Sequence, residues 1–189
     1  HIAWTHRYGN SRVAFLQSGH DRQAYENPSF RQILRQSILW TTCRIPVEKP
    51  DKDGFVSLFN GKNLDGWTVY DNPQGFTVKD GVIRSASGTG AGWLRTVRPY
   101  SDFVLKVEWR TNKNGNSGVF VRAPHSPDPW ITGMEIQISN EPRDEKHCTG
   151  SIYGCVGVDP RPDETADKWH SFEISCIGNK VAILADGVQ

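Results

Sequence analysis

The chain has 189 residues and a formal net charge of +1, from 22 Lys and Arg against 21 Asp and Glu. This balance argues against a nucleic-acid or membrane-surface protein, because such proteins carry a basic patch or stripe. No apolar run approaches the roughly 20 residues of a membrane helix, so we expect no membrane span. The 18 Gly, 11 Pro and 7 Trp favour a β-rich, turn-rich fold.

Residues 1–42 predict two strands followed by a helix. The run "RVAFLQSG" is typical of a short strand that ends at Gly19, and "ENPSFRQILRQSILWTT" is the clearest helix of the chain. Asn27 suits the N-cap and Pro28 the first helical position. Apolar residues then recur at helical spacing, at Phe30, Ile33, Leu34 and Ile38.

A segment of this size cannot bury a core alone, so its packing partner is expected upstream of His1. The chain also ends in the middle of a strand-turn pattern. We therefore expect a fragment that is cut at both ends.

Residues 43–52 have the composition of a linker, with two prolines and alternating charges. From residue 53 onward, short alternating runs are separated by turn signals at Asn60-Gly61, Asp65-Gly66, Asp80-Gly81 and Gly178-Asn179. No helix is indicated after residue 54. Many short strands with frequent turns predict a mainly β fold, a sandwich or a barrel.

Three of these strands alternate polar with apolar residues, so each has an apolar face for the core. The polar positions hold Glu108, Arg110, Asn116, Arg122, Glu135 and Gln137. Half-exposed antiparallel sheets commonly look like this. Amides and guanidinium groups, however, also suit the binding of sugar hydroxyls or an oxyanion. A solvated face and the floor of a site both remain open.

Aromatic and acidic residues leave similar alternatives. Trp67, Trp93, Trp130 and Trp169 fall near strand ends or in loops, where a Trp either packs or stacks on a sugar ring. The acidic run "DPRPDETAD" at 159–167 is interpreted as a solvated loop. The spacing of Cys43, Cys148, Cys155 and Cys176 fits no zinc pattern. Cys148 and Cys155 are candidates for a loop disulfide, but free thiols are the simpler interpretation.

Seven blocks in order make residues 53–189 resemble the 3-keto-disaccharide hydrolase family: "FVSLFNGKNLDGW", "FTVKDGVI", "YSDFVLKVEWR", "NSGVFVR", "MEIQI", "TGSIYG" and "KWHSFEI". The resemblance implies a concanavalin A-like jelly-roll sandwich, here truncated at its C-terminus. It also implies a carbohydrate substrate and an exported bacterial protein, periplasmic or secreted, whose signal lies outside this chain.

Residues 1–42 resemble the C-terminal end of a ThuA-like, trehalose-utilisation domain, through "WTHRYG", "GHD" and "NPSF". That resemblance implies a strand-strand-helix remnant of a flavodoxin-like α/β fold. The rest of this α/β domain would then be the missing upstream partner.

The hydrolase resemblance implies cleavage of 3-keto-glycosides by base-driven elimination followed by hydration. This chemistry needs a base, an electrophile for the enolate and control of the leaving group. We expect Glu135 to be the base, Arg110 and Arg122 to hold the enolate or carbonyl oxygen, and His147 to move a proton. Expected substrate contacts are Asn116, Gln137, Tyr153, Glu108 and Trp169.

Two alternatives and one cofactor question stay open. Glu108 and Glu135 would be the pair of a conventional two-carboxylate glycosidase, and the same sandwich would also serve as a non-catalytic sugar-binding module. His170 is, like His147, either a proton or metal site or a structural residue. No cofactor is certain. A divalent metal such as calcium is considered, although no Asp-rich loop spells out a site.

Overall fold

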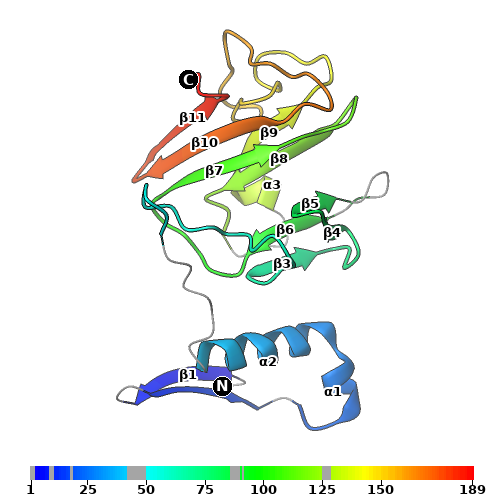
Figure 1. The fold of residues 1–189 in the computed structure, drawn as a ribbon, viewed down its shortest axis with the longest axis vertical. Coiled ribbons are helices and arrows are strands. Elements are labelled where there is room, and N and C mark those ends of the chain that lie inside the picture. The colour runs from blue at the N-terminus through cyan, green and yellow to red at the C-terminus, as the bar shows by residue number, and fades with distance from the viewer. Residues whose placement is uncertain are drawn as a thin grey trace. The chain divides into compact units, whose positions relative to one another are not determined.

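The computed structural model of the chain describes residues 3–8, 11–17, 19–41, 50–85, 90, 92–124 and 129–189 (Figure 1). It contains two compact units, His1–Asn60 and Gly61–Gln189. Of the expected linker, residues 43–49 and with them Cys43 lie outside the described residues. Within the described residues, no helix is long and apolar enough to cross a membrane.

The first unit is a hairpin followed by two helices. Strands β1 (Ala3–Tyr8) and β2 (Ser11–Leu16) pair antiparallel, and α1 (Arg22–Glu26) precedes α2 (Pro28–Thr41). The N-cap prediction for α2 is confirmed, because Asn27 Oδ1 accepts hydrogen bonds from the Ser29 and Phe30 amides at 2.9 and 3.2 Å. Helix α1 was not indicated by the sequence.

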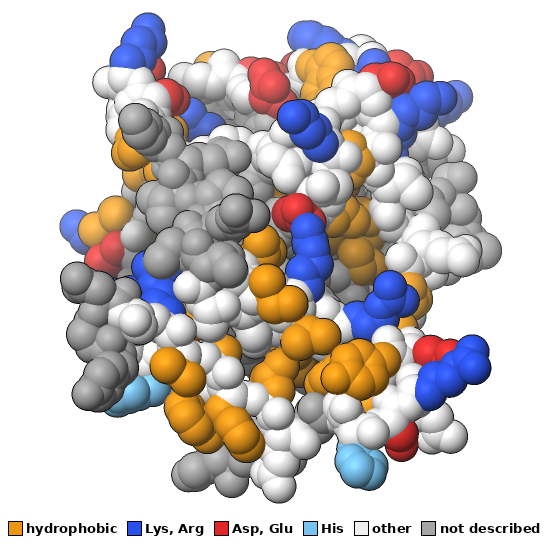
Figure 2. Space-filling view, turned by 60° about the horizontal axis from the view of Figure 1, so that its bottom comes forward, with side chains coloured by type: hydrophobic (Ala, Val, Ile, Leu, Met, Phe, Trp, Pro, Cys, Tyr) orange, Lys and Arg blue, Asp and Glu red, His pale blue; other side chains and the backbone are white. Residues whose placement is uncertain are grey.

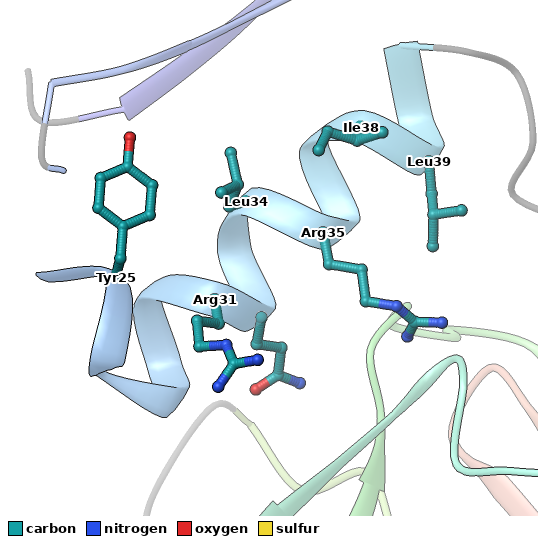
Figure 3. A pocket seen from close by; sticks show the side chains of 7 residues that line it. Tyr25, Arg31, Leu34, Arg35, Ile38 and Leu39 are labelled. Atoms are coloured by element: carbon teal, nitrogen blue, oxygen red, sulfur yellow. The ribbon is translucent and has the colours of Figure 1, made fainter. Parts of the chain in front are cut away.

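The predicted apolar face of α2 is only partly buried. Phe30 is buried, with Tyr25 packed edge-on against it at 5.3 Å, whereas Ile33 and Ile38 are each about half exposed. Figure 3 shows the open groove along α2, lined by Tyr25, Leu34 and neighbouring side chains. Figure 2 shows that one face of the molecule exposes hydrophobic side chains interspersed with Lys and Arg. The ThuA-like assignment stays a prediction.

The second unit begins with two small antiparallel sheets. Strand β3 (Trp67–Tyr70) pairs with β6 (Trp93–Thr96), and β4 (Phe76–Lys79) pairs with β5 (Val82–Ser85). The turn between β4 and β5 has positive φ at both central residues, Asp80 (54°) and Gly81 (74°). Positive φ at both positions is the geometry that an Asp-Gly hairpin turn provides, so this hairpin prediction is confirmed.

The main body is a sandwich of two antiparallel sheets, as expected for the mainly β jelly-roll class (Figure 1). One sheet has the order β11–β10–β7 and contains β7 (Phe103–Trp109), β10 (His170–Ile177) and β11 (Lys180–Ala185). The other pairs β8 (Asn116–Val121) with β9 (Met134–Ser139). The hairpin predicted at Gly178-Asn179 is confirmed, since β10 and β11 pair around it.

Two features differ from the sequence-based expectation. A one-turn helix, α3 (Pro129–Thr132), lies just before β9, although no helix was indicated after residue 54. Strands β7 and β8 follow one another around the Asn-Lys-Asn-Gly turn, yet they belong to different sheets. The chain therefore crosses the sandwich between them.

The core lies between the two sheets. Its buried members are Val121, Ile136, Ile138, Phe172, Ile174 and Cys176, with the apolar side of β7 packed against them. Because side chains alternate along a strand, the polar side chains of β7 and those of β9 point away from this core in opposite directions. Two predicted site residues can therefore belong to one site only if they lie on the same outward face of the sandwich.

Candidate active site

The outward face of β8 and β9 carries a continuous row of functional side chains. Phe120 is in register with Glu135 across the β8–β9 pair. On the other side of β9, Ile136 bridges Ile152 antiparallel, and the Tyr153 amide donates to the Glu135 carbonyl at 2.9 Å. Tyr153 is therefore opposite Glu135, and opposite residues share a face. We call this surface, formed by Asn116, Phe120, Glu135, Gln137 and Tyr153, the Glu135 face.

Glu135 is a partly buried carboxylate whose side chain lies over Gly118. A Cβ built on Gly118 would come within 2.3 Å of Glu135 Oε1, so the absence of a side chain there makes room for the carboxylate. Burial raises the pKa of Glu135 above its usual 4.5, and the nearby positive charge of Arg143 only partly offsets this effect. A carboxylate with a raised pKa in a partly enclosed position is suited to general acid–base chemistry.

Next to Glu135, Gln137 and Asn116 form an amide pair at the floor of the Glu135 face. Gln137 is only 1% exposed, and its Nε2 donates to Asn116 Oδ1 at 3.0 Å. Its Oε1 has no hydrogen-bond partner among the described residues. A buried acceptor without a partner is costly, and because this oxygen is enclosed, Gln137 acts on the face through its bond to Asn116. Asn116 is exposed and can reach a ligand directly.

Tyr153 connects Glu135 to a histidine with a carboxylate behind it. The His147 ring packs edge-on against Tyr153 at 4.7 Å between ring centroids. His147 Nδ1 lies 2.7 Å from Asp144 Oδ1, and this hydrogen bond is the main cause that lowers the pKa of Asp144. A carboxylate bound to Nδ1 fixes the tautomer that leaves Nε2 free to take a proton.

The residues that the sequence analysis missed come from the segment after β9. Arg143 Nε donates to Ser139 Oγ at 3.2 Å, and its guanidinium also contacts Glu141. Arg143 is thus the basic group whose charge acts on Glu135. Asp144 and Arg143 both lie in "SNEPRDEKH". Only the proximity of this run to the strand of Glu135 could have pointed to them.

The acidic run at 159–167 is more than a solvated loop, because Glu164 is a structural residue. Its Oε1 accepts from the Thr149 amide at 2.9 Å, and its Oε2 lies 3.0 Å from Arg161 NH2. Thr149 in turn exchanges two hydrogen bonds with Ser139 of β9, at 2.7 and 2.9 Å. Glu164 therefore fixes the segment that carries Tyr153 beside β9.

The expectation that Arg110 and Glu108 share a face with Glu135 is wrong. Glu108 lies on the outward side of β7, whose other side packs in the core against β9, and Arg110 directly follows that strand. The Arg110 guanidinium stacks over the Trp169 ring at 5.1 Å, at the start of β10. Trp169 thus belongs to the β7–β10 face as well. The carboxylates of Glu108 and Glu135 lie on opposite sides of the sandwich and cannot flank one glycosidic bond.

Arg122 is also absent from the Glu135 face. It has a φ of 55°, which interrupts the alternation just after β8 ends at Val121. Its guanidinium donates to the Gly178 carbonyl at 2.9 Å and pairs with Asp102 at 3.2 Å. Both partners belong to the ends of the opposite sheet. Arg122 therefore fastens the two sheets together at one end.

His170 is a structural histidine at the start of β10. It is 3% exposed, and its ring stacks on Trp109 at 4.7 Å. Nδ1 lies 2.9 Å from Asp186 Oδ2 and Nε2 lies 3.0 Å from the Thr165 carbonyl. Two acceptors on the two ring nitrogens favour the imidazolium. Burial alone lowers the pKa of His170, but the hydrogen bonds to Thr165 and Asp186 outweigh it, so the pKa is raised above 6.5.

We therefore expect the stability of the second unit to fall as pH rises through the folded-state pKa of His170. A raised folded-state pKa contributes stability fully below the unfolded value of 6.5, and this contribution disappears at higher pH. Urea unfolding at about pH 6 and about pH 9 would measure the change. The variant His170→Gln should flatten it, and an NMR titration of the imidazole should show the raised pKa. An equal slope in both proteins would contradict the expectation.

Two further expectations concern sulfur and metal ligands. Cys148 and Cys176 are buried free thiols and Cys155 is an exposed one, so the free-thiol interpretation holds for the described cysteines and the disulfide is not formed. Among the residues that the structure describes, no group of three or more His, Cys, Asp or Glu side chains is placed to hold a metal ion. Metal dependence stays a prediction for experiment.

A family model and a curated relative match most of the chain. Residues 54–189 match the model of a family described as the 3-keto-alpha-glucoside-1,2-lyase-like domain. A curated relative from Bacteroides thetaiotaomicron, named 3-keto-disaccharide hydrolase, is 28% identical over 162 residues, which cover 70% of this chain and 55% of the relative. The chain thus spans about half the length of that relative.

Solved structures agree with the fold. A crystal structure from Parabacteroides distasonis, named provisionally as a glycosyl hydrolase, matches with a TM-score of 0.61 and 25% identity, over 70% of this chain and 69% of that one. A second from the same organism, with the same provisional name, matches with a TM-score of 0.58 and 25% identity, over 67% and 65% of the two chains.

Proposed function

The chain belongs to the family of 3-keto-alpha-glucoside-1,2-lyase-like domains, and from this membership we propose that its second unit cleaves the glycosidic bond of 3-keto-glycosides. The curated relative is named a 3-keto-disaccharide hydrolase, which supports a carbohydrate hydrolase. The observation that carries the proposal is Glu135, a partly buried carboxylate of raised pKa on a face that also carries Asn116, Gln137 and Tyr153.

The proposed reaction begins with proton abstraction. The hydrogen on carbon 2 is acidic because it is adjacent to the carbonyl at carbon 3. Glu135 removes this proton, and the electron pair of the C2–H bond forms an enolate. The carbonyl then re-forms, a double bond arises between carbons 1 and 2, and the C1–O bond breaks with its electrons on the leaving oxygen. Addition of water across the double bond returns a 3-keto sugar, so the net result is hydrolysis.

Charge development in this reaction matches the groups around Glu135. The enolate oxygen becomes negative, and Arg143 is the cation whose field reaches the carboxylate site. A positioned cation stabilises such a charge more strongly in a partly enclosed site than in water. The exposed amide of Asn116 would bind sugar hydroxyls, and Gln137 would orient that amide by donating Nε2 to Asn116 Oδ1 at 3.0 Å.

The leaving oxygen needs a proton as the C1–O bond breaks. His147 and Tyr153 are in ring contact beside Glu135, and Asp144 orients the imidazole through Nδ1. We assign His147 the role of proton donor and acceptor at Nε2, and Asp144 that of a positioning residue. Tyr153 is exposed and offers a hydroxyl to the substrate.

The test is release of a chromogenic aglycone from a 3-keto-glucoside and from the matching unoxidised glucoside. The proposal expects turnover of the keto sugar alone. Product analysis would separate elimination from complete hydrolysis, because the first yields an unsaturated ketone and the second a 3-keto sugar. Assays with and without a chelator decide the metal question. Turnover of the plain glucoside would refute the elimination mechanism. Sugar binding without any turnover would favour a binding module.

A further inference from the structure

A row of aromatic side chains in mutual contact extends from the small β3–β6 sheet to α3, next to the end of β9 that carries Glu135. Tyr70 and Trp93 face each other in register and stack at 5.9 Å between ring centroids. On the same face, the Arg95 guanidinium lies 4.7 Å from the centre of the Tyr70 ring. Trp93 contacts Trp130 edge-to-face at 5.1 Å, with an interplanar angle of 85°. The Trp130 ring is thus in contact with Trp93, which itself stacks on Tyr70.

Trp130 lies close to the catalytic end of the Glu135 face. It belongs to α3, which directly precedes β9 and contacts it. Figure 1 shows α3 between the β8–β9 pair and the small sheets. Gly133, which follows α3, approaches Ala123 beyond the end of β8 so closely that a Cβ there would lie 2.7 Å from the Ala123 Cβ. This contact fixes α3 at the end of the pair where Phe120 and Glu135 are opposite each other.

The Trp130 ring is open to solvent. The residue is 55% exposed, so the ring cannot be covered on both faces. A tryptophan that served only packing would be largely buried. Its edge-to-face contact with Trp93 limits its rotamer freedom, so that binding a ligand would order little further. A rigid, exposed indole face suits the flat array of C–H groups on one side of a pyranose ring.

We propose that Trp130 is the binding platform for the second sugar ring of a 3-keto-disaccharide, the ring that leaves. This inference rests on the proposed function, because the oxidised ring must lie over Glu135 for its carbon-2 proton to be removed. The adjacent ring then extends beyond the Glu135 face, and α3 is the element at that end. The platform makes the site selective for disaccharides over glycosides with a small aglycone.

The test compares Trp130→Ala, Trp130→Phe and wild type on two substrates, a 3-keto-disaccharide and a methyl 3-keto-glucoside. We expect Trp130→Ala to lower kcat/KM on the disaccharide about tenfold, equivalent to ~1.4 kcal/mol, with little change on the methyl glycoside. Trp130→Phe should keep much of the activity because it retains an aromatic face. The control is Trp4→Ala, which removes a comparably exposed Trp, 45% exposed and stacked on Phe15, from the first unit.

Equal losses on both substrates, or no loss on either, would overturn the platform. A binding measurement separates this result from failure of the proposed function. The unoxidised disaccharide is titrated by NMR into wild type and Trp130→Ala. Suppose that no keto sugar is turned over, that the disaccharide still binds, and that Trp130→Ala weakens this binding. Trp130 would then be supported as the binding platform, and the proposed lyase chemistry would be refuted. If wild type neither binds nor turns over the sugars, both are refuted.

Discussion

Glu135→Gln is expected to lower kcat on a 3-keto-glucoside by about 10²- to 10⁴-fold, the usual contribution of a positioned acid–base group. Glutamine keeps the shape of the side chain but cannot accept the carbon-2 proton. Binding should change little, because the amide pair of Asn116 and Gln137 remains in place. Steady-state kinetics give the first quantity, and titration with the unoxidised glucoside gives the second.

The pH dependence of kcat/KM is a second, independent test of Glu135 as the base. A base acts in its deprotonated form, so kcat/KM should be lost as pH falls through the pKa of Glu135. Burial places this pKa above 4.5, and the acid limb of the profile should therefore lie above the ordinary range of a Glu. In Glu135→Gln, whatever activity remains should lack that limb.

Substitutions at two other carboxylates serve as controls for Glu135→Gln. Glu173 lies on the outward face of β10, where it pairs with Lys106 at 3.6 Å, and Glu173→Gln should leave kcat unchanged. Glu108→Gln should also leave kcat unchanged, since Glu108 is on the far side of the core from Glu135. A loss in Glu108→Gln as deep as in Glu135→Gln would contradict the site geometry and revive a two-carboxylate mechanism.

The alternation of residues along a strand determined what could be predicted of the Glu135 face. Period 2 places Glu135 and Gln137 on one side of β9 and Ile136 and Ile138 on the other, and the structure confirms this division. The same rule says only that a polar face points away from the core. A sandwich has two such faces, and the sequence pattern carries no sign of which sheet a strand joins. Glu108 and Arg110 were misplaced for this reason.

Other errors arise where local patterns yield to long-range contacts. Arg122 leaves the alternation through a positive φ, which Gly or Asn would have signalled but Arg does not. Glu164 was interpreted as a solvated acid from its charged surroundings, yet it is bound to Thr149, 15 residues away. The Asp144–His147 pair lies within one loop, but its place beside Glu135 depends on the pairing of Tyr153 with β9.

Gly118→Ala is the second variant for which we expect a large effect, because Gly118 shapes the carboxylate site without touching substrate chemistry itself. An alanine Cβ would lie 2.3 Å from Glu135 Oε1 and 2.6 Å from its Cγ. Gly118 is not among the glycines with positive φ, so the backbone accepts alanine and the Glu135 side chain must move instead.

A displacement of about 1 Å at a catalytic group commonly costs about 10²-fold in rate, and we expect a loss of that order in kcat for Gly118→Ala. The thermal unfolding midpoint should change little, because the displaced side chain lies on the outward face. Ser117→Ala is the matched control, since Ser117 neighbours Gly118 on the opposite face of β8. If Gly118 acts through Glu135, adding Gly118→Ala to Glu135→Gln should cost nothing further. Full additivity of the two losses would show that Gly118 matters for a reason other than the placement of the Glu135 carboxylate.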